Sequence, residues 1–312
     1  MNSTLIKEKD TSSAAASLST HIVSVDVEDY FMVEAFAGTV SRATWDTWPS
    51  RVVTNTKRVL DLFDKYNVKG TFFFLGWVAD KYPDLVRDVH ARGHELACHS
   101  FWHRTVYSLT PNEFREDTRA AKCAIEDAAG IKVIGYRAPS WSITKECLWA
   151  LDILAEEGFG YDSSIYPIHH DLYGMPGAQR FPYTHHLKEN RCLLEFPPTT
   201  VRLLGQNLPA AGGGYLRILP LAFTNWVFRR FEEEYRERVV VYFHPWELDP
   251  GQPRIRDKWK SRLRHYTSLH RMESRIELLL QSYSFRPFSE LLVAQEVAEK
   301  MPLLEIPRAP HE

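Results

Sequence analysis

The sequence has 312 residues, 44% of them hydrophobic, and a formal net charge of −2. This length fits a single α/β barrel and allows a sizeable core. The near-neutral charge argues against a nucleic-acid-binding surface, which is normally strongly basic. No apolar run reaches the roughly 18 residues of a membrane span, so none is predicted.

The chain ends and the cysteines suggest where the protein resides. Residues 1–20 are polar with no apolar signal core, and we expect a disordered tail there. Residues 21–290 form the predicted domain, and residues 291–312 a C-terminal tail. The four cysteines form no CxxC pair, which favours buried thiols in a reduced compartment. These features together predict a soluble cytoplasmic protein.

Short β-rich runs alternate with helical patterns along the chain. The best-marked helix covers 110–130, with Thr110 as N-cap, Pro111 at the first position and Glu113 three residues on. Other helices are expected over 51–66, 82–93, 144–158, 219–235 and 268–281. Strands are expected over 21–26, 71–76, 94–100, 132–137, 159–164, 192–199 and 238–244. Seven strands with helices between them predict an α/β fold, a parallel barrel or open sheet with helical crossovers.

Five of these strands end at an ionisable side chain. The residues are Asp26, His99, Arg137, Asp162 and His244, whereas strands 71–76 and 192–199 are interpreted as ending without one. Because the carboxyl ends of barrel strands ring one face, this pattern predicts a site there. The Gly- and Pro-rich loops 163–190 and 199–217 are expected to shape a cleft, and the basic segment 250–267 to form a surface arm.

His99 and His103 are spaced to reach one metal ion if they lie on a helical turn. The spacing alone is weak evidence, because the chain has 13 histidines. The acidic group Asp26, Glu28 and Asp29 follows a buried strand and offers a third ligand. Acids at such a position also cap helices, but three carboxylates are more than a cap needs.

Five motifs occur in order and in the expected strand context. They are VDVEDYF, HELACHSFWH, YRAPSWS, YDSSIYP and VVYFHPWEL. Over residues 21–290 the chain resembles the polysaccharide deacetylases of carbohydrate esterase family four, which share the NodB-homology domain. More narrowly, it looks like the cytoplasmic bacterial branch found beside exopolysaccharide and exosortase loci, related to allantoinase-like and peptidoglycan deacetylase-like enzymes.

The resemblance implies a deformed (β/α)7 barrel with one divalent metal held by a carboxylate and two histidines. His99 and His103 match the two imidazole ligands, and Asp26 matches the catalytic base. Arg137 resembles the arginine that pairs with this base, and His244 the general acid. Zinc is the expected ion, although cobalt, nickel or iron suit the same ligands.

The chain departs from the family motif at Val27, where a second aspartate is usual. Side chains alternate along a strand, so Asp26 and Glu28 are expected on the same side, which favours Glu28 as the metal carboxylate. Asp29 remains the alternative if the backbone bulges.

Several residues beside the motifs have both a functional and a packing interpretation. Trp141, Tyr166 and Trp246 are candidates for stacking against sugar rings, although core or rim packing explains each of them equally well. Asp162 is a candidate support for Arg137 or for a histidine. The basic residues of 254–264 could meet an anionic polysaccharide or a lipid-carrier phosphate, but a solvated arm is the simpler interpretation.

The leading hypothesis is a metal-dependent hydrolase that removes N-acetyl groups from an amino-sugar polysaccharide or its precursor in exopolysaccharide biosynthesis. One alternative is allantoinase-like hydrolysis of a cyclic amide on the same fold. Another is a carbohydrate-binding pseudoenzyme with a structural metal. The sequence does not identify the polymer, the position deacetylated or the oligomeric state.

Overall fold

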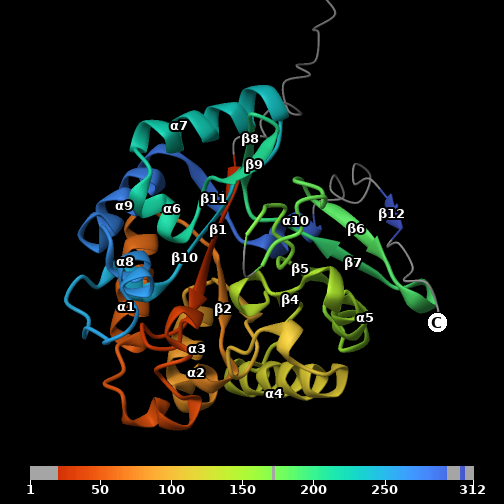
Figure 1. Cartoon of the computed structure of the whole chain (residues 1–312), viewed down its shortest axis with the longest axis horizontal. Helices are drawn as coiled ribbons and strands as arrows, with labels where there is room; N and C mark the ends of the chain where they lie inside the picture. Colours follow the sequence, from red (N-terminus) through yellow and green to blue (C-terminus); the bar gives the residue numbers. More distant parts are fainter. Residues whose placement is uncertain (1–19, 171–172, 294–302, 306–312) are drawn as a thin grey trace, which may run out of the picture.

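The computed structural model describes residues 20–170, 173–293 and 303–305 (Figure 1). The predicted N-terminal tail lies outside the described residues except for Thr20, which begins the first strand. Within the predicted C-terminal tail, residues 291–293 end helix α10 (Phe288–Val293), and Leu303–Glu305 form strand β12. This part of the tail is therefore secondary structure.

The seven predicted strands form one parallel array, in the order β10-β1-β2-β3-β4-β5-β7. This arrangement confirms the α/β class, and the strands end together at one edge. Their bounds are β1 (Thr20–Val27), β2 (Thr71–Phe74), β3 (Glu95–Cys98), β4 (Gly135–Tyr136), β5 (Tyr161–Asp162), β7 (Cys192–Glu195) and β10 (Val240–Phe243).

Other strands lie outside this parallel array and were not predicted from the sequence. β6 (Tyr183–His186) runs antiparallel to β7 and pairs with β12 on its other side. β11 (Ser284–Arg286) pairs with the start of β1, and β8 (Thr200–Leu203) with β9 (Gln206–Pro209) forms a separate hairpin. The predicted loops 163–190 and 199–217 thus contain β6 and this hairpin.

Helices follow most of the parallel strands and cover the outside of the sheet (Figure 1). The N-terminus of α4 has the predicted capping box between Thr110 and Glu113, and its C-terminus ends at Gly130 with a left-handed backbone. A π-helical turn over Phe231–Tyr235 continues α7. The helix bounds are α1 (Val52–Lys65), α2 (Gly76–Lys81), α3 (Pro83–Ala91), α4 (Pro111–Ala129), α5 (Trp149–Glu156), α6 (Gly213–Ile218), α7 (Leu221–Arg230), α8 (Trp259–Tyr266) and α9 (Met272–Ser282).

Alternation along the strands places apolar residues on both faces of the sheet. The larger core lies between the sheet and the covering helices and includes Val25 and Phe74. The smaller core lies on the opposite face of the sheet and includes Phe73 and Phe288, the latter from α10. The Phe288 amide donates to Thr71 Oγ1 at the first residue of β2, so α10 closes the amino end of this inner space. The carboxyl end is left for polar side chains.

No strand pairing among the described residues joins β7 to β10. The segment between these strands lies against the free edge of β10 instead. The Val240 amide donates to Thr199 Oγ1 (2.7 Å), and the Tyr242 amide donates to the Ala211 carbonyl (3.3 Å). The base of the β8–β9 hairpin therefore covers the gap in the array.

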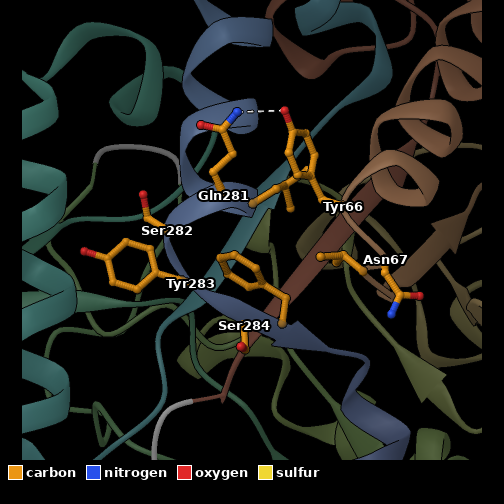
Figure 2. Close-up of a pocket in the computed structure, with 9 residues that line it drawn as sticks. Tyr66, Asn67, Gln281, Ser282, Tyr283 and Ser284 are labelled. Atoms are coloured by element: carbon orange, nitrogen blue, oxygen red, sulfur yellow. Dashed lines mark hydrogen bonds between the residues drawn. The ribbon is translucent and has the colours of Figure 1, made fainter.

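A surface hollow of about 250 Å³ lies away from the carboxyl edge (Figure 2). Its lining includes Asn67, which precedes β2, and Phe285, which pairs with the start of β1, so it belongs to the amino edge. Gln281 Nε2 donates to Tyr66 Oη across its rim (2.7 Å). No carboxylate or imidazole lines this hollow, and it gives no support for chemistry there.

All four cysteines are free, as expected. Cys98 and Cys147 are buried, but Cys123 and Cys192 are exposed, so the prediction that all four are buried is wrong for two of them. Among the described helices, none is both long and apolar enough to cross a bilayer.

Candidate functional site

The carboxyl edge brings Glu28, His99 and His103 together. One ligand atom from each lies within 4.8 Å of the others, and all three residues are buried. Glu28 follows β1, His99 follows β3, and His103 lies in the loop after His99. Two parallel strands on either side of β2 thus deliver a carboxylate and an imidazole to one point.

Glu28 is placed by the turn that ends β1. Its amide donates to the Asp26 carbonyl (3.1 Å), so the chain bends immediately after Val27, the last residue of β1. The direction of the Glu28 side chain is therefore not determined by strand alternation alone. Trp246 Nε1 donates to Glu28 Oε1 (3.1 Å). Burial alone would raise the pKa of Glu28, but the nearby imidazoles of the site, His103 above all, lower it to about 2. The carboxylate is therefore anionic, as a metal ligand must be.

His99 is oriented by the main chain of the next strand. Its Nδ1 lies 2.8 Å from the Arg137 carbonyl oxygen, which can only accept, so Nδ1 carries the hydrogen. The lone pair of Nε2 is then free, the tautomer that metal-binding histidines use. Burial lowers the pKa of His99 to about 4 and keeps the ring neutral.

The segment from His99 to His103 is a loop, so the predicted helical turn is wrong. Ser100 and His103 have left-handed backbones, with φ of 68° and 51°. The buried Asp117 of α4 holds the loop by accepting from Ser100 Oγ (2.6 Å) and from the Phe101 amide (2.8 Å). Asp117 was not identified from the sequence, because its position within a helix gives no sign of a contact with this loop.

The donor set fits a divalent cation. Two imidazoles and one carboxylate leave coordination positions open for water or a carbonyl oxygen. His103 Nε2 lies 2.9 Å from Glu28 Oε2. Glu28 Oε2 and His103 Nδ1 are nevertheless buried without a well-formed hydrogen bond among the described residues. A buried carboxylate oxygen facing two imidazoles is more stable with a cation between them.

Asp29, the alternative metal carboxylate, has a different set of partners. Its Oδ2 accepts from Ser50 Oγ (2.7 Å) and from the amides of Arg51 (2.7 Å) and Val52 (3.1 Å). These amides open helix α1, where a carboxylate caps free N–H groups and complements the helix dipole. Of these two acids, Glu28 therefore lies with the imidazoles, and Asp29 lies with the start of α1.

Asp26 and Arg137 form a buried ion pair beside this cluster. Arg137 Nη1 donates to Asp26 Oδ1 (2.7 Å) and to Ser24 Oγ (2.9 Å), and Nη2 donates to Ser163 Oγ (3.1 Å). The guanidinium also lies 4.1 Å from the centre of the Phe73 ring. The pair is thus fixed from both sides, and Asp26 Oδ2 is left facing His244.

His244 lies across from the two carboxylates. Its Nε2 is 3.9 Å from Asp26 Oδ2 and 3.6 Å from Glu28 Oε1, and its side chain is 19% exposed. Its Nδ1 contacts Glu247 Oε1 at 2.7 Å, and Glu247 in turn pairs with the buried Arg217 (2.6 Å). Burial alone would lower the pKa of His244, but the hydrogen bond to Glu247 and the charges of Glu28 and Glu247 raise it to about 9.

Glu247 and Arg217 were not singled out from the sequence. Glu247 lies within the quoted motif VVYFHPWEL, three residues after His244, which is the spacing of a capping box. That signal could have identified it. Arg217 lies in a predicted loop and gave no signal of its own.

The three predicted sugar-stacking residues are packed inside the protein. Tyr166 is fully buried, and Trp141 and Trp246 are 6% and 5% exposed. The Trp246 ring stacks on His244 (5.1 Å) and on His265 (4.1 Å). In this structure the rings support the site from within, and none offers an open face to a sugar. Trp102, which precedes His103 in the chain, is by contrast 37% exposed.

Asp162 contacts neither Arg137 nor His244 among the described residues; the histidine on which its charge acts is His185. Its register partner on the neighbouring strand is Glu195, and both are fully buried. Burial raises the pKa of both carboxyls, that of Glu195 to about 7. Glu195 Oε1 accepts from the Ile165 amide (3.0 Å), which braces the loop carrying Ser163. Glu195 is the last residue of β7, so the prediction that strand 192–199 ends without an ionisable group is wrong.

The fold and the site together define a parallel α/β protein with a candidate mononuclear metal centre at its carboxyl edge. Residues 37–156 match the family model of polysaccharide deacetylases, and residues 163–293 match a domain of unknown function (DUF3473). The first match contains His99, His103 and Arg137. This chain carries a polysaccharide deacetylase domain of the NodB-homology type.

Individual relatives agree with this assignment. Over 111 residues the chain is 33% identical to a bifunctional xylanase/deacetylase of Pseudobutyrivibrio xylanivorans, covering 35% of this chain and 18% of that protein. It is 29% identical over 123 residues to a peptidoglycan-N-acetylglucosamine deacetylase of Bacillus cereus, covering 38% and 44%. The matched part is thus less than half the length of either relative.

A solved structure shares the fold over nearly the whole chain. A polysaccharide deacetylase candidate from Mycobacterium smegmatis superposes with a TM-score of 0.60 at 20% sequence identity, covering 94% of this chain and 96% of that one. This likeness supports the architecture alone.

Proposed function

We propose that this protein is a metal-dependent N-deacetylase that hydrolyses the acetamide of an amino sugar within a polysaccharide or its precursor. Zinc is the expected ion. From the motif resemblance we extend the proposal to a cytoplasmic role in exopolysaccharide biosynthesis. The deacetylase domain supports the reaction class, and the positions of the residues at the carboxyl edge support the roles proposed for them.

One observation carries the proposal. The Glu28, His99 and His103 cluster lies directly beside an ion-paired aspartate and an accessible histidine. Hydrolysis of an amide needs a group that takes a proton from water and a group that gives one to the departing amine. Asp26 and His244 meet this need on either side of the cluster.

The roles follow from these positions. Glu28, His99 and His103 would hold a divalent ion, which would supply Lewis-acid chemistry toward the acetamide carbonyl and toward water. Asp26, held by Arg137, accepts the proton of the attacking water. His244 donates a proton to the amine nitrogen as the carbon–nitrogen bond breaks, and Glu247 keeps the imidazole oriented. The products are acetate and the free amino sugar.

The test combines metal analysis with acetate release. Purified protein should bind about one divalent ion per chain and release acetate from N-acetylglucosamine oligomers, and a chelator should stop this release. His99→Ala should lose both metal and turnover. Asp26→Asn should keep the metal and lose turnover, because the ligands stay intact while the base is absent.

Other results would favour the two alternatives. Metal binding without acetate release from any amino-sugar polymer would favour the carbohydrate-binding pseudoenzyme. Chelator-resistant hydrolysis of allantoin would favour the cyclic amide hydrolase. Full activity in Asp26→Asn would refute the role given to the base.

A further inference from the structure

A basic surface lies over residues 254–264, outside the site. It contains six cationic residues and one acid, Asp257, which gives this stretch a net charge of +5 (6 − 1) in a chain whose total is −2. All six cations are exposed, and none forms an ion pair with a described residue. They are Arg254, Arg256, Lys258, Lys260, Arg262 and Arg264. We call this segment with its helix α8 the α8 surface.

Two large apolar side chains lie among these charges. Trp259 is 68% exposed and Leu263 is 58% exposed. They are four residues apart on α8, so they share one face of the helix. Helical spacing places Lys260 and Arg264 on one side of this pair and Arg262 on the other. The outer face of α8 is thus an apolar strip, Trp259 and Leu263, with cations on both sides.

The inner face of α8 is firmly attached to the protein. His265 is buried, stacks on Trp246 (4.1 Å) and contacts Gln252 Oε1 through Nε2 (2.7 Å). Arg217 donates to the carbonyls of His265 (2.8 Å) and Thr267 (2.7 Å). In Figure 1, α8 lies outside the sheet, toward the left of the view. The exposed strip is therefore presented on a fixed support.

We propose that the α8 surface docks on an anionic lipid bilayer. Basic residues close to an anionic leaflet are attracted to it, and each one adds to the binding. Tryptophan prefers the boundary between headgroups and acyl chains, and a leucine one helical turn away can enter the same layer. The bilayer is the partner that satisfies both the charges and the apolar strip.

Two other occupants fit less well. An acidic polysaccharide would neutralise the cations but offers no apolar phase for Trp259 and Leu263. A second copy of the chain would bring two surfaces of the same positive charge together, which opposes association.

The inference goes beyond the proposed function and does not depend on it. Docking would nevertheless fix the orientation of the site, because His265 on α8 stacks on Trp246, which donates to Glu28.

Vesicle co-sedimentation tests the proposal. The full chain should bind vesicles of equal parts phosphatidylglycerol and phosphatidylcholine, should not bind pure phosphatidylcholine, and should dissociate as salt is raised. Lys260→Glu/Arg264→Glu should weaken binding roughly tenfold or more, since two attractions become repulsions. Trp259→Ser/Leu263→Ser should also weaken it roughly tenfold, because the apolar strip is removed. All four side chains are exposed, so the variants should melt like the parent.

Matched substitutions elsewhere provide the controls. Lys132→Glu/Lys145→Glu changes charge equally at exposed positions, and Leu278→Ser removes a side chain that is 42% exposed on α9. Both should bind as the parent does. Acetate release from soluble oligomers should be unchanged in the α8 variants. If the parent released no acetate, the vesicle result would still decide this proposal.

Three outcomes would overturn it. The first is failure of the parent to bind anionic vesicles. The second is unchanged vesicle binding by Trp259→Ser/Leu263→Ser, which would mean that charge alone drives the binding. Retention of the protein on immobilised polygalacturonate would then indicate an acidic polymer as its partner. The third is a dimer, seen by light scattering, that the same substitutions dissociate.

Discussion

Arg137 and Asp26 come from strands that are not neighbours, and they meet as a fully buried ion pair with 2.7 Å between Nη1 and Oδ1. The inner side of the parallel array contains this charge pair at its carboxyl end. A buried charge is stable only while its partner is present. Much of the site therefore depends on one contact.

Removal of the Arg137 side chain should strongly lower both the stability of the fold and the rate of acetate release. We expect Arg137→Ala to lower the free energy of unfolding by about 3–5 kcal/mol, because Asp26 would remain buried without its partner. Chemical denaturation and acetate release measure the two effects. In the double variant Asp26→Asn/Arg137→Ala, stability should recover in part while activity stays absent; additive losses would show that the pair is not coupled.

Asp117 should control the metal affinity without touching the metal. Asp117→Ala removes the acceptor for Ser100 Oγ and the Phe101 amide, so the loop that carries His103 loses its support. We expect the affinity for the ion to fall roughly 10–100-fold, as for other residues that orient ligands. Titration with zinc measures this. The neighbouring exposed Glu116→Gln on the same helix should change nothing.

Glu247 should tune the proton donor. Since Glu247 helps to raise the pKa of His244 to about 9, Glu247→Gln should lower that pKa. The donor would then lose its proton at a lower pH, and the alkaline limb of the kcat profile should move in that direction, with kcat reduced roughly tenfold or more. Metal content should be unchanged. If Glu247→Gln/His244→Gln had a lower kcat than His244→Gln alone, Glu247 would not act through His244, and this prediction would be contradicted.

Glu195 should make stability depend on pH in an unusual direction. Its folded pKa of about 7 lies above the ordinary value of 4.5, so the folded protein holds a proton that the unfolded chain releases. Its contribution to stability is complete below pH 4.5 and is lost as the pH rises to 7.

Replacement by glutamine should remove this dependence. Between pH 4.5 and 7, Glu195→Gln should gain up to about 3 kcal/mol relative to the parent. Urea denaturation across this range measures the difference, with exposed Glu189→Gln as the matched control. A constant difference at all pH values would contradict the raised pKa.

The parallel strands and the long helices were predictable from the sequence because their signals are local. The helix of 110–130 has its cap, its proline and its terminal glycine within the segment itself. The added strands β6, β8, β9 and β11 have four residues or fewer; β6 and the β8–β9 pair form hairpins, and β11 pairs with the distant β1. Such pairing leaves little pattern in a short run of residues.

The site was predictable where a side chain lies at the end of a strand. Asp26, His99, Arg137 and His244 follow this rule, and they meet at one edge as expected. Asp117 and Arg217 lie on helices, and their roles come from tertiary contacts across the chain. The spacing of His99 and His103 was informative for a different reason than assumed, because a left-handed loop turns His103 toward Glu28.

The turn that ends β1 contributes, within four residues, to an ion pair, to the candidate metal cluster and to a helix cap. Asp26 meets Arg137, Glu28 faces the two histidines, and Asp29 caps α1. Each insertion or deletion here would move the following residue by about 3.8 Å along the chain, more than a hydrogen bond allows. The length of this stretch is therefore under tighter physical constraint than its composition, and engineered variants of the domain should keep its residue count unchanged.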